Sequence, residues 1–192
     1  GRHGIAHKLD HVGALAFGNF ENAFRVKHAA FIKNDRHTVE ERAPDRPHRR
    51  HVHQRGEWKQ LERIAIAGAL GQRCAPGDRV ALLYPPGLDF LEAFFGCLYA
   101  GVIAVPAYPP RNQGHLPRLR AVVTDSGAGW ALTNAKTLGN VQAFIAGDEA
   151  WTALNWLATD TVPAVAADAW LSPEVRAESV AFLQYTSGST GT

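Results

Sequence analysis

Residues 77–111, GDRVALLYPPGLDFLEAFFGCLYAGVIAVPAYPPR, hold a helical pattern between two short apolar runs. The runs 79–84 and 102–107 contain few polar residues, which is typical of strands buried on both faces of a parallel sheet. Pro85, Pro86 and Gly87 end the first run, and Gly101 ends the helical pattern. The segment therefore predicts a strand, a helix and a second strand in one β-α-β unit.

The helix of this unit carries large apolar residues at helical spacing. They predict one apolar face packed on the sheet, formed by Leu88, Leu91, Phe94, Phe95 and Leu98. The aromatic residues Phe94, Phe95 and Tyr99 are interpreted as packing between helix and sheet, in preference to the lining of a tunnel for an acyl chain.

The same alternation continues on both sides of the unit. Apolar residues at helical spacing predict further helices over 61–69, 116–125 and 136–145. Short apolar runs predict further strands over 130–133, 156–159 and 181–185.

Repeated β-α-β units with short connections imply parallel strands joined by right-handed crossovers. The predicted fold class is therefore α/β, a doubly wound, largely parallel sheet with helices on both faces. Ligands of such sheets bind outside the carboxyl ends of the strands. The loops that we expect to matter follow Tyr84, Ala107, Thr133 and Tyr185.

Charge divides the chain near residue 56. Residues 1–56 hold eleven Lys and Arg against six Asp and Glu, and residues 57–192 hold nine against twelve. Residues 40–56, EERAPDRPHRRHVHQRG, lack any apolar pattern, and such a segment cannot bury enough surface to become ordered. We expect residues 1–56 to be a basic, His- and Arg-rich leader that is poorly ordered or non-native, and residues 57–192 to form the domain.

The leader has other interpretations, which the sequence supports less well or which concern only part of the leader. His37, His48, His51 and His53 do not predict a metal site, because no Cys or carboxylate falls at a zinc spacing. The basic run lacks the motifs of a nucleic-acid-binding domain, so no nucleic-acid partner is expected. Its composition is also that of a GC-rich gene read in the wrong frame. Apolar spacing over residues 12–32 could form a helix.

Composition excludes several classes of protein. With 46% hydrophobic and 20% charged residues, the chain is neither disordered throughout nor collagenous. Two cysteines are too few for a disulfide scaffold, so we expect buried, reduced thiols and a cytoplasmic location. No apolar run approaches the length of about 18 residues that a membrane span needs. The absence of methionine and the glycine-rich end suggest a piece of a longer protein.

The last seven residues, TSGSTGT at 186–192, follow directly after a predicted strand. Glycines allow successive backbone N–H groups to turn toward one point, and hydroxyls add donors, so the run is interpreted as a cradle for phosphate. A flexible linker is the alternative for such a composition, but its place after an apolar strand favours the cradle. Neither GxxxxGK[ST] nor GxGxxG matches.

YTSGSTGT at 185–192 resembles the phosphate-binding signature of the AMP-forming acyl-activating superfamily, in which Pro-Lys-Gly follows. Residues 77–111 resemble the opening of fatty acyl-AMP ligases, including those that load polyketide and nonribosomal assembly lines. The resemblance covers about residues 60–192. It implies an incomplete first part of an adenylate-forming N-terminal domain, an N-terminal fragment that ends within the phosphate-binding loop.

The resemblance also implies a reaction. A long-chain fatty acid and Mg²⁺-bound ATP give an acyl-adenylate and pyrophosphate, and the acyl group passes to an acyl carrier protein or to a polyketide or nonribosomal synthetase. Six residues would bind the ATP phosphates: Thr186, Ser187, Gly188, Ser189, Thr190 and Gly191. No catalytic residue or metal ligand of the family falls within the chain, which should be inactive alone.

Three alternatives stay open. A long-chain acyl-CoA ligase and a nonribosomal adenylation domain are near relatives of the same superfamily. A non-catalytic remnant that only binds polyanions belongs to a different class.

Overall fold

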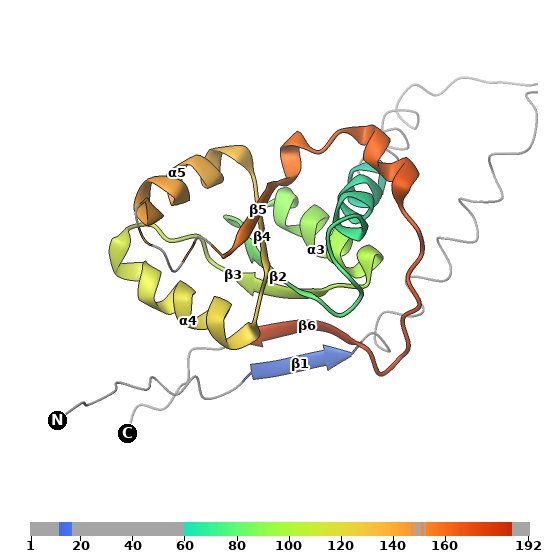
Figure 1. Cartoon of the computed structure of the whole chain (residues 1–192), viewed down its shortest axis with the longest axis horizontal. Coiled ribbons are helices and arrows are strands. Elements are labelled where there is room, and N and C mark those ends of the chain that lie inside the picture. The colour runs from blue at the N-terminus through green and yellow to red at the C-terminus, as the bar shows by residue number, and fades with distance from the viewer. Residues whose placement is uncertain (1–11, 17–59, 147, 149–150, 152, 186–192) are drawn as a thin grey trace, which may run out of the picture.

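The computed structural model describes residues 12–16, 60–146, 148, 151 and 153–185, and this part of the chain forms one sheet covered by helices (Figure 1). Its strands are β1 (Val12–Ala16), β2 (Arg79–Leu83), β3 (Ile103–Ala107), β4 (Trp130–Thr133), β5 (Asn155–Ala158) and β6 (Val180–Tyr185). Its α-helices are a helix over residues 60–71, α3 (Leu88–Ala100), α4 (Leu116–Ser126) and α5 (Ala135–Ile145). Its short 3₁₀ helices are η2 (Gln113–His115), η4 (Thr159–Thr161) and η5 (Ala164–Ala169).

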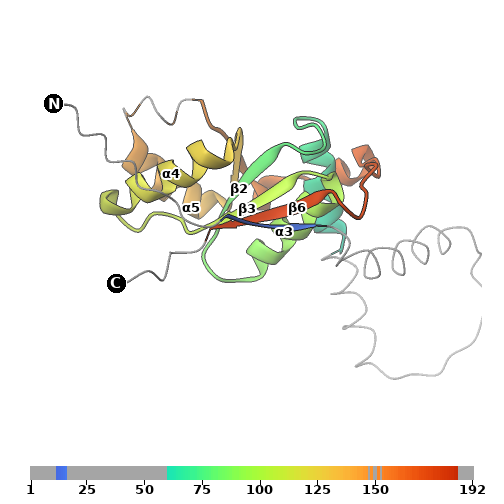
Figure 2. The same ribbon diagram turned by 90° about the horizontal axis from the view of Figure 1, so that it is seen from below.

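The strand order is β1-β6-β3-β2-β4-β5. The five strands from β6 to β5 in this order are parallel to one another, and the edge strand β1 pairs antiparallel with β6. All five strands predicted between residues 79 and 185 are therefore confirmed, with ends that differ by a residue or so. The chain passes from β2 to β3 on one side and then crosses β2 to reach β4, so α3 and α4 lie on opposite faces of the sheet (Figure 2).

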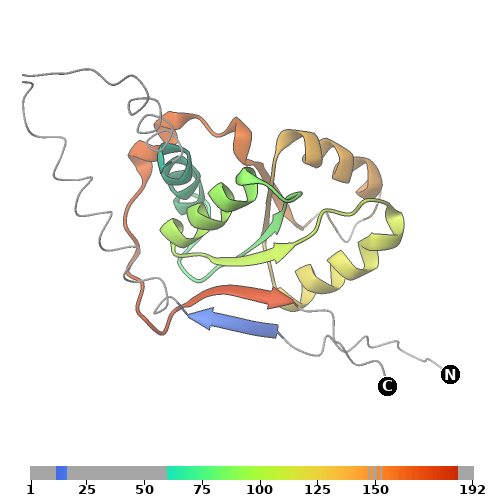
Figure 3. The same ribbon diagram turned by 180° about the vertical axis from the view of Figure 1, so that it is seen from behind.

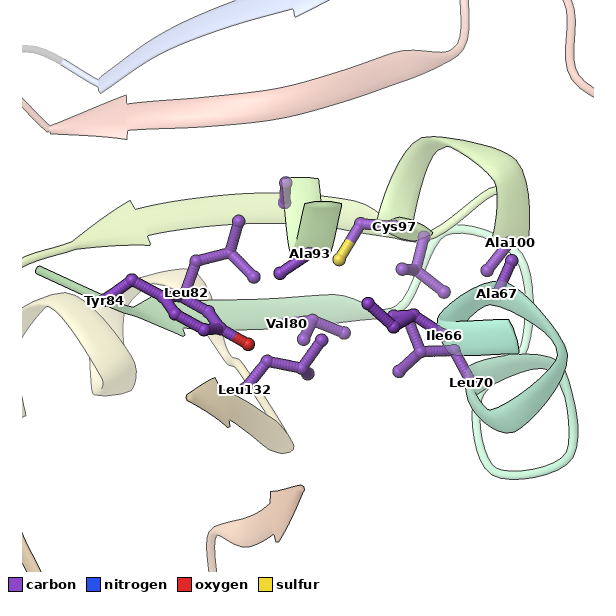
Figure 4. Close-up of a cluster of buried hydrophobic side chains, with 12 residues drawn as sticks. Ile66, Ala67, Leu70, Val80, Leu82, Tyr84, Ala93, Cys97, Ala100 and Leu132 are labelled. Atoms are coloured by element: carbon purple, nitrogen blue, oxygen red, sulfur yellow. The ribbon is translucent and has the colours of Figure 1, made fainter. Parts of the chain in front are cut away.

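Strand β2 supplies both halves of the core, because successive side chains of a strand point to opposite faces. Val80 and Leu82 face the helix over 60–71 and α3, in the cluster shown in Figure 4. Ala81 and Leu83 face α4 and pack with Leu119. All four of these β2 side chains are fully buried, so the doubly wound prediction is confirmed.

The buried face of α3 differs from the predicted one. Leu98 is buried as expected, but Leu88 and Leu91 are 57% and 43% exposed. Small residues form the core face instead: Ala93, Gly96, Cys97 and Ala100. The reason is the helix over 60–71, which approaches so closely that a Cβ at Gly96 would lie 2.6 Å from the Ile66 Cγ2.

Phe94 and Phe95 of α3 pack against β6, as predicted, whereas Tyr99 packs against a residue outside the sheet. The Phe94 ring meets Phe182 of β6 edge-on, with 5.4 Å between the ring centroids. Tyr99 packs against Trp170, whose indole N–H also donates to the Tyr99 carbonyl oxygen at 2.8 Å. These contacts join α3 to β6 and to the segment after η5.

Strand β1 lies in the range for which a helix seemed possible, and for residues 12–16 that interpretation is wrong. Its backbone pairs antiparallel with β6, from Val12 opposite Tyr185 to Ala16 opposite Val180 (Figure 1). Without β1, β6 would be the edge strand of the sheet and would offer unpaired backbone groups. Pairing of residues 12–16 with these groups overrides the helical spacing of their side chains. The other residues of 1–56, including the four histidines considered as a metal site, lie outside the described residues, so the leader remains a prediction.

Candidate functional site

The six residues predicted to bind phosphate, Thr186 to Gly191, lie outside the described residues. The strand that leads to them is described. Strand β6 lies between β1 and β3 and runs parallel to β3, with Phe182 opposite Ala104. Its last residue, Tyr185, therefore reaches the edge of the sheet at which β3 ends, where ligands of parallel sheets bind.

Tyr185 is tied to the end of α4. Its hydroxyl donates a hydrogen bond to Asp125 Oδ2 at 2.7 Å. Burial of the ring and the hydrogen bond to this carboxylate raise the pKa of Tyr185 to about 12, so the hydroxyl keeps its proton at neutral pH. Figures 1 and 3 show the end of α4 beside the tip of β6. No signal in the sequence pairs these residues, which are 60 positions apart.

An open hollow of about 570 Å³ lies along α4 next to this contact. Leu116, Arg120, Thr124 and Asp125 line it from α4, and Asp148 also lines it. Arg120 and Asp148 form an ion pair. The hollow thus combines apolar and charged groups close to the end of β6.

The carboxyl ends of β2 and β4 form the topological switch point, the other place where a ligand was expected. Here the structure brings the predicted loops together, but their polar groups bind one another. Thr133 Oγ1 donates to the Leu83 carbonyl oxygen at 2.6 Å, and Thr159 Oγ1 donates to the Thr133 carbonyl oxygen at 3.4 Å. The Tyr84 hydroxyl lies 2.8 Å from Thr159 Oγ1, and burial raises its pKa well above the ordinary range.

The helix that begins at this switch point is capped by its own neighbours. Asn134 Oδ1 accepts from the Thr137 backbone N–H at 2.9 Å, and Asp160 Oδ1 accepts from the Ala135 N–H at 2.8 Å. Asn134 Nδ2 donates to Asp89 Oδ2 at 2.9 Å. These contacts occupy donors that an anionic ligand would need. The geometry therefore favours the end of β6 over the switch point as the candidate site.

The other expectations about sites can be compared with the described residues. In that part of the chain, no three His, Cys, Asp or Glu side chains gather as metal ligands would. Cys97 is fully buried and Cys74 is half-buried, so the prediction of burial holds for only one of the two free thiols. None of the described helices has both the length and the apolarity of a membrane-spanning segment.

A parallel, doubly wound sheet whose β6 leads into a run of glycine, serine and threonine defines this protein as an α/β domain with its candidate site at the end of that strand. The chain belongs to the family of AMP-binding enzymes, which it matches over residues 37–192. The fold is that of the N-terminal domain of adenylate-forming enzymes.

Two curated relatives and one solved structure indicate the branch of this family. The long-chain-fatty-acid–AMP ligase FadD32 of Mycobacterium marinum is 43% identical over 126 residues, which are 66% of this chain and 20% of the relative. The medium-chain-fatty-acid–[acyl-carrier-protein] ligase JamA of Moorena producens is 39% identical over 141 residues, covering 70% of this chain and 24% of the relative.

The solved structure is the fatty acyl-adenylate ligase of L. pneumophila in complex with acyl adenylate and pyrophosphate. It has a TM-score of 0.60 and 35% identity, and the match covers 70% of this chain and 23% of that one. The chain thus spans between a fifth and a quarter of the length of these proteins.

Proposed function

We propose that this chain is the phosphate-binding part of a fatty acid–AMP ligase. The complete reaction joins a long-chain fatty acid to ATP, forms an acyl-adenylate and releases pyrophosphate. The acyl group then passes to the thiol of an acyl carrier protein, alone or within a polyketide or nonribosomal synthetase. The names of FadD32 and JamA support this activity and this acceptor. The proposed domain of the enzyme is residues 57–192, to whose sheet β1 (Val12–Ala16) adds an edge strand, and the other residues of 1–56 are the leader.

One observation carries the proposal: β6 is a parallel strand inside the sheet, so residue 186 begins where ligands of such sheets bind. By their sequence, the six residues from Thr186 to Gly191 supply backbone N–H groups and hydroxyls directly after this strand. Their role is to hold the β- and γ-phosphates. Such oriented donors favour anionic oxygens because glycine lets neighbouring N–H groups converge.

The reaction brings two anions, the carboxylate and ATP, together and expels a third, pyrophosphate, so their negative charge must be stabilised. A carboxylate oxygen attacks the α-phosphorus, and the bond from this phosphorus to the oxygen that bridges to the β-phosphate breaks. Donors already aimed at the phosphates stabilise the negative charge that collects on the leaving pyrophosphate. Mg²⁺ accompanies ATP in this proposal and adds positive charge there, but the described residues contain no set of ligands for it. Free thiols fit a reducing cytoplasm, which we propose as its location.

A long-chain acyl-CoA ligase is the second candidate. The fatty acyl CoA synthetase of Mycobacterium tuberculosis has a related structure, with a TM-score of 0.52 and 25% identity. The acyl-AMP and carrier-protein ligases are 43% and 39% identical, which favours the first candidate.

Binding to the chain itself tests the phosphate site. Isotope-labelled protein is titrated with Mg-ATP, inorganic tripolyphosphate and adenosine, and backbone amide signals are followed by NMR. ATP and tripolyphosphate should shift the signals of residues 186–191, and adenosine should leave them in place. Unchanged signals with both phosphate compounds would exclude these residues as the phosphate site.

Activity is tested in a chimera, in which residues 60–192 replace the matching part of the M. marinum FadD32. Removing one donor from a transition state costs about 3 kcal/mol, so Thr186→Ala should slow pyrophosphate release at least tenfold. Thr161→Ala, which removes a hydroxyl from an exposed turn, is the matched control. A Thr186→Ala chimera as fast as the control would remove Thr186 from the mechanism.

A further inference from the structure

We propose that Asp125 is a positioning residue for the phosphate-binding loop, on which it acts through the hydroxyl of Tyr185. The inference rests on the proposed function, because it assigns to residues 186–191 the role of holding phosphate. Asp125 itself touches no phosphate in this proposal. It fixes the side chain of the last residue before the loop.

The contact lies where the strand is about to end. Tyr185 is the last residue of β6, and Thr186 is the next residue in the chain. The register with β3 is defined at Phe182, three residues earlier, and on the other side Tyr185 pairs with Val12 of the edge strand β1. The 2.7 Å hydrogen bond to Asp125 adds a link from the tip of β6 to the helical layer. A restrained Tyr185 in turn restrains the backbone from which the loop departs.

Asp125 is held in place by the end of α4. Its neighbours Val122 and Ser126 are buried, with 5% and 6% of their surfaces exposed. Gly127 closes the helix in the left-handed conformation, with φ of 65° and N–H contacts to the carbonyls of Thr124 and Val123. Asp125 itself is exposed, and its carboxylate projects from a helix end whose packing and cap are formed by residues outside the loop.

Local preference does not explain an aspartate at this position. The carboxyl end of a helix carries partial negative charge, so a carboxylate in the last turn of α4 is unfavourable for the helix. Residues that break a local rule are expected where they serve a site. Here the charge strengthens the hydrogen bond from Tyr185, since bonds to an ionised acceptor are shorter and stronger than neutral ones.

The test measures the affinity of the full 192-residue chain for Mg-ATP by NMR titration. Asp125→Ala and Tyr185→Phe should each weaken binding about 5-fold, which corresponds to one hydrogen bond of ordinary strength. The double variant should bind no more weakly than Tyr185→Phe, because that change already removes the hydrogen bond to Asp125 together with a side-chain contact to Ser126. Asp125→Asn keeps an acceptor and should restore affinity to within about 2-fold of the unmodified chain.

Asp148→Ala is the matched control. It removes the same charge from the same hollow, and Asp148 pairs with Arg120 instead of Tyr185. Because this variant leaves the hydrogen bond between Tyr185 and Asp125 intact, its affinity for Mg-ATP should not fall below that of the unmodified chain. The unfolding temperature of each variant is recorded, so that the affinities of Asp125→Ala, which removes the acceptor, and Asp125→Asn, which keeps one, are compared at known stability.

The outcomes separate this inference from the proposed function. Unchanged affinity in Asp125→Ala, additive losses in the double variant, or an equal loss in Asp125→Asn would each overturn the positioning role while phosphate binding stands. An unmodified chain that binds neither Mg-ATP nor tripolyphosphate would overturn the proposed function and this inference together. Tyr185→Phe and Asp125→Asn preserve size and shape, so the comparison survives if Asp125→Ala fails to fold.

Discussion

Replacing Gly96 with alanine is expected to destabilise the protein by about 1–2 kcal/mol, although alanine is the better helix former. The new Cβ would lie 2.6 Å from Ile66 Cγ2 and 2.9 Å from Ile66 Cβ, where ordinary contact begins at 3.4 Å. Ile66 is buried and β-branched, and such a side chain has one strongly preferred rotamer in a helix. The two helices must therefore move apart.

The magnitude follows from two opposing effects. Alanine in place of glycine in a helix interior gains about 1 kcal/mol. Overpacking a tight core costs about 1–3 kcal/mol, and the contact with a stiff side chain places Gly96 toward the upper end. Gly139 lies in the interior of α5, and a Cβ added there would meet nothing within 4 Å, so Gly139→Ala should stabilise the protein by about 0.5–1 kcal/mol.

The assay is urea unfolding followed by far-ultraviolet circular dichroism at about 25 °C. The same substitution in two helices is expected to shift the free energy of unfolding in opposite directions. Ile66→Leu moves the branch away from Cβ and should recover part of the loss in the Gly96→Ala background. If Gly96→Ala were as stable as Gly139→Ala, the close helix contact that defines the core face of α3 would be refuted.

Three further predictions concern stability and are checked by the same unfolding measurement. Thr133→Val removes the buried hydroxyl that donates to the Leu83 carbonyl oxygen and should cost about 1–2 kcal/mol; an unchanged midpoint would contradict that bond. Asn134→Ala removes the side-chain cap that accepts from the Thr137 N–H and should cost about 1 kcal/mol, while Asn134→Ser keeps a capping oxygen without placing a second carboxylate beside Asp89 and should retain most of this stability. Burial raises the pKa of the Cys97 thiol above the pKa that it has in the unfolded chain. The contribution of the buried thiol to the free energy of unfolding is therefore intact at neutral pH and is lost as the pH rises above about 8.5. Between about pH 8.5 and pH 10 this thiol should lower the free energy of unfolding by about 2 kcal/mol, and Cys97→Ala should show a correspondingly shallower decline with pH.

The candidate site was only partly visible in the sequence. The run 186–192 suggested a phosphate cradle because its composition is unusual after an apolar strand, and its role remains a proposal. The switch-point loops were expected to bind a ligand, but Thr133, Asn134 and Asp160 bind their own neighbours. Whether a donor is free depends on groups that come from other segments, and spacing along the chain does not reveal them.

The sequence by itself determined the order and kind of the strands and α-helices between residues 79 and 185, but not the short 3₁₀ helices among them. Apolar runs, helical spacing and turn residues act over about ten residues, and that is the range over which backbone hydrogen bonds select helix or strand. Tertiary structure alone decided which face of α3 is buried, that residues 12–16 pair with β6, and that Asp125 meets Tyr185. Each of these depends on contacts between distant segments, whose free energy exists only once the sheet has brought them together.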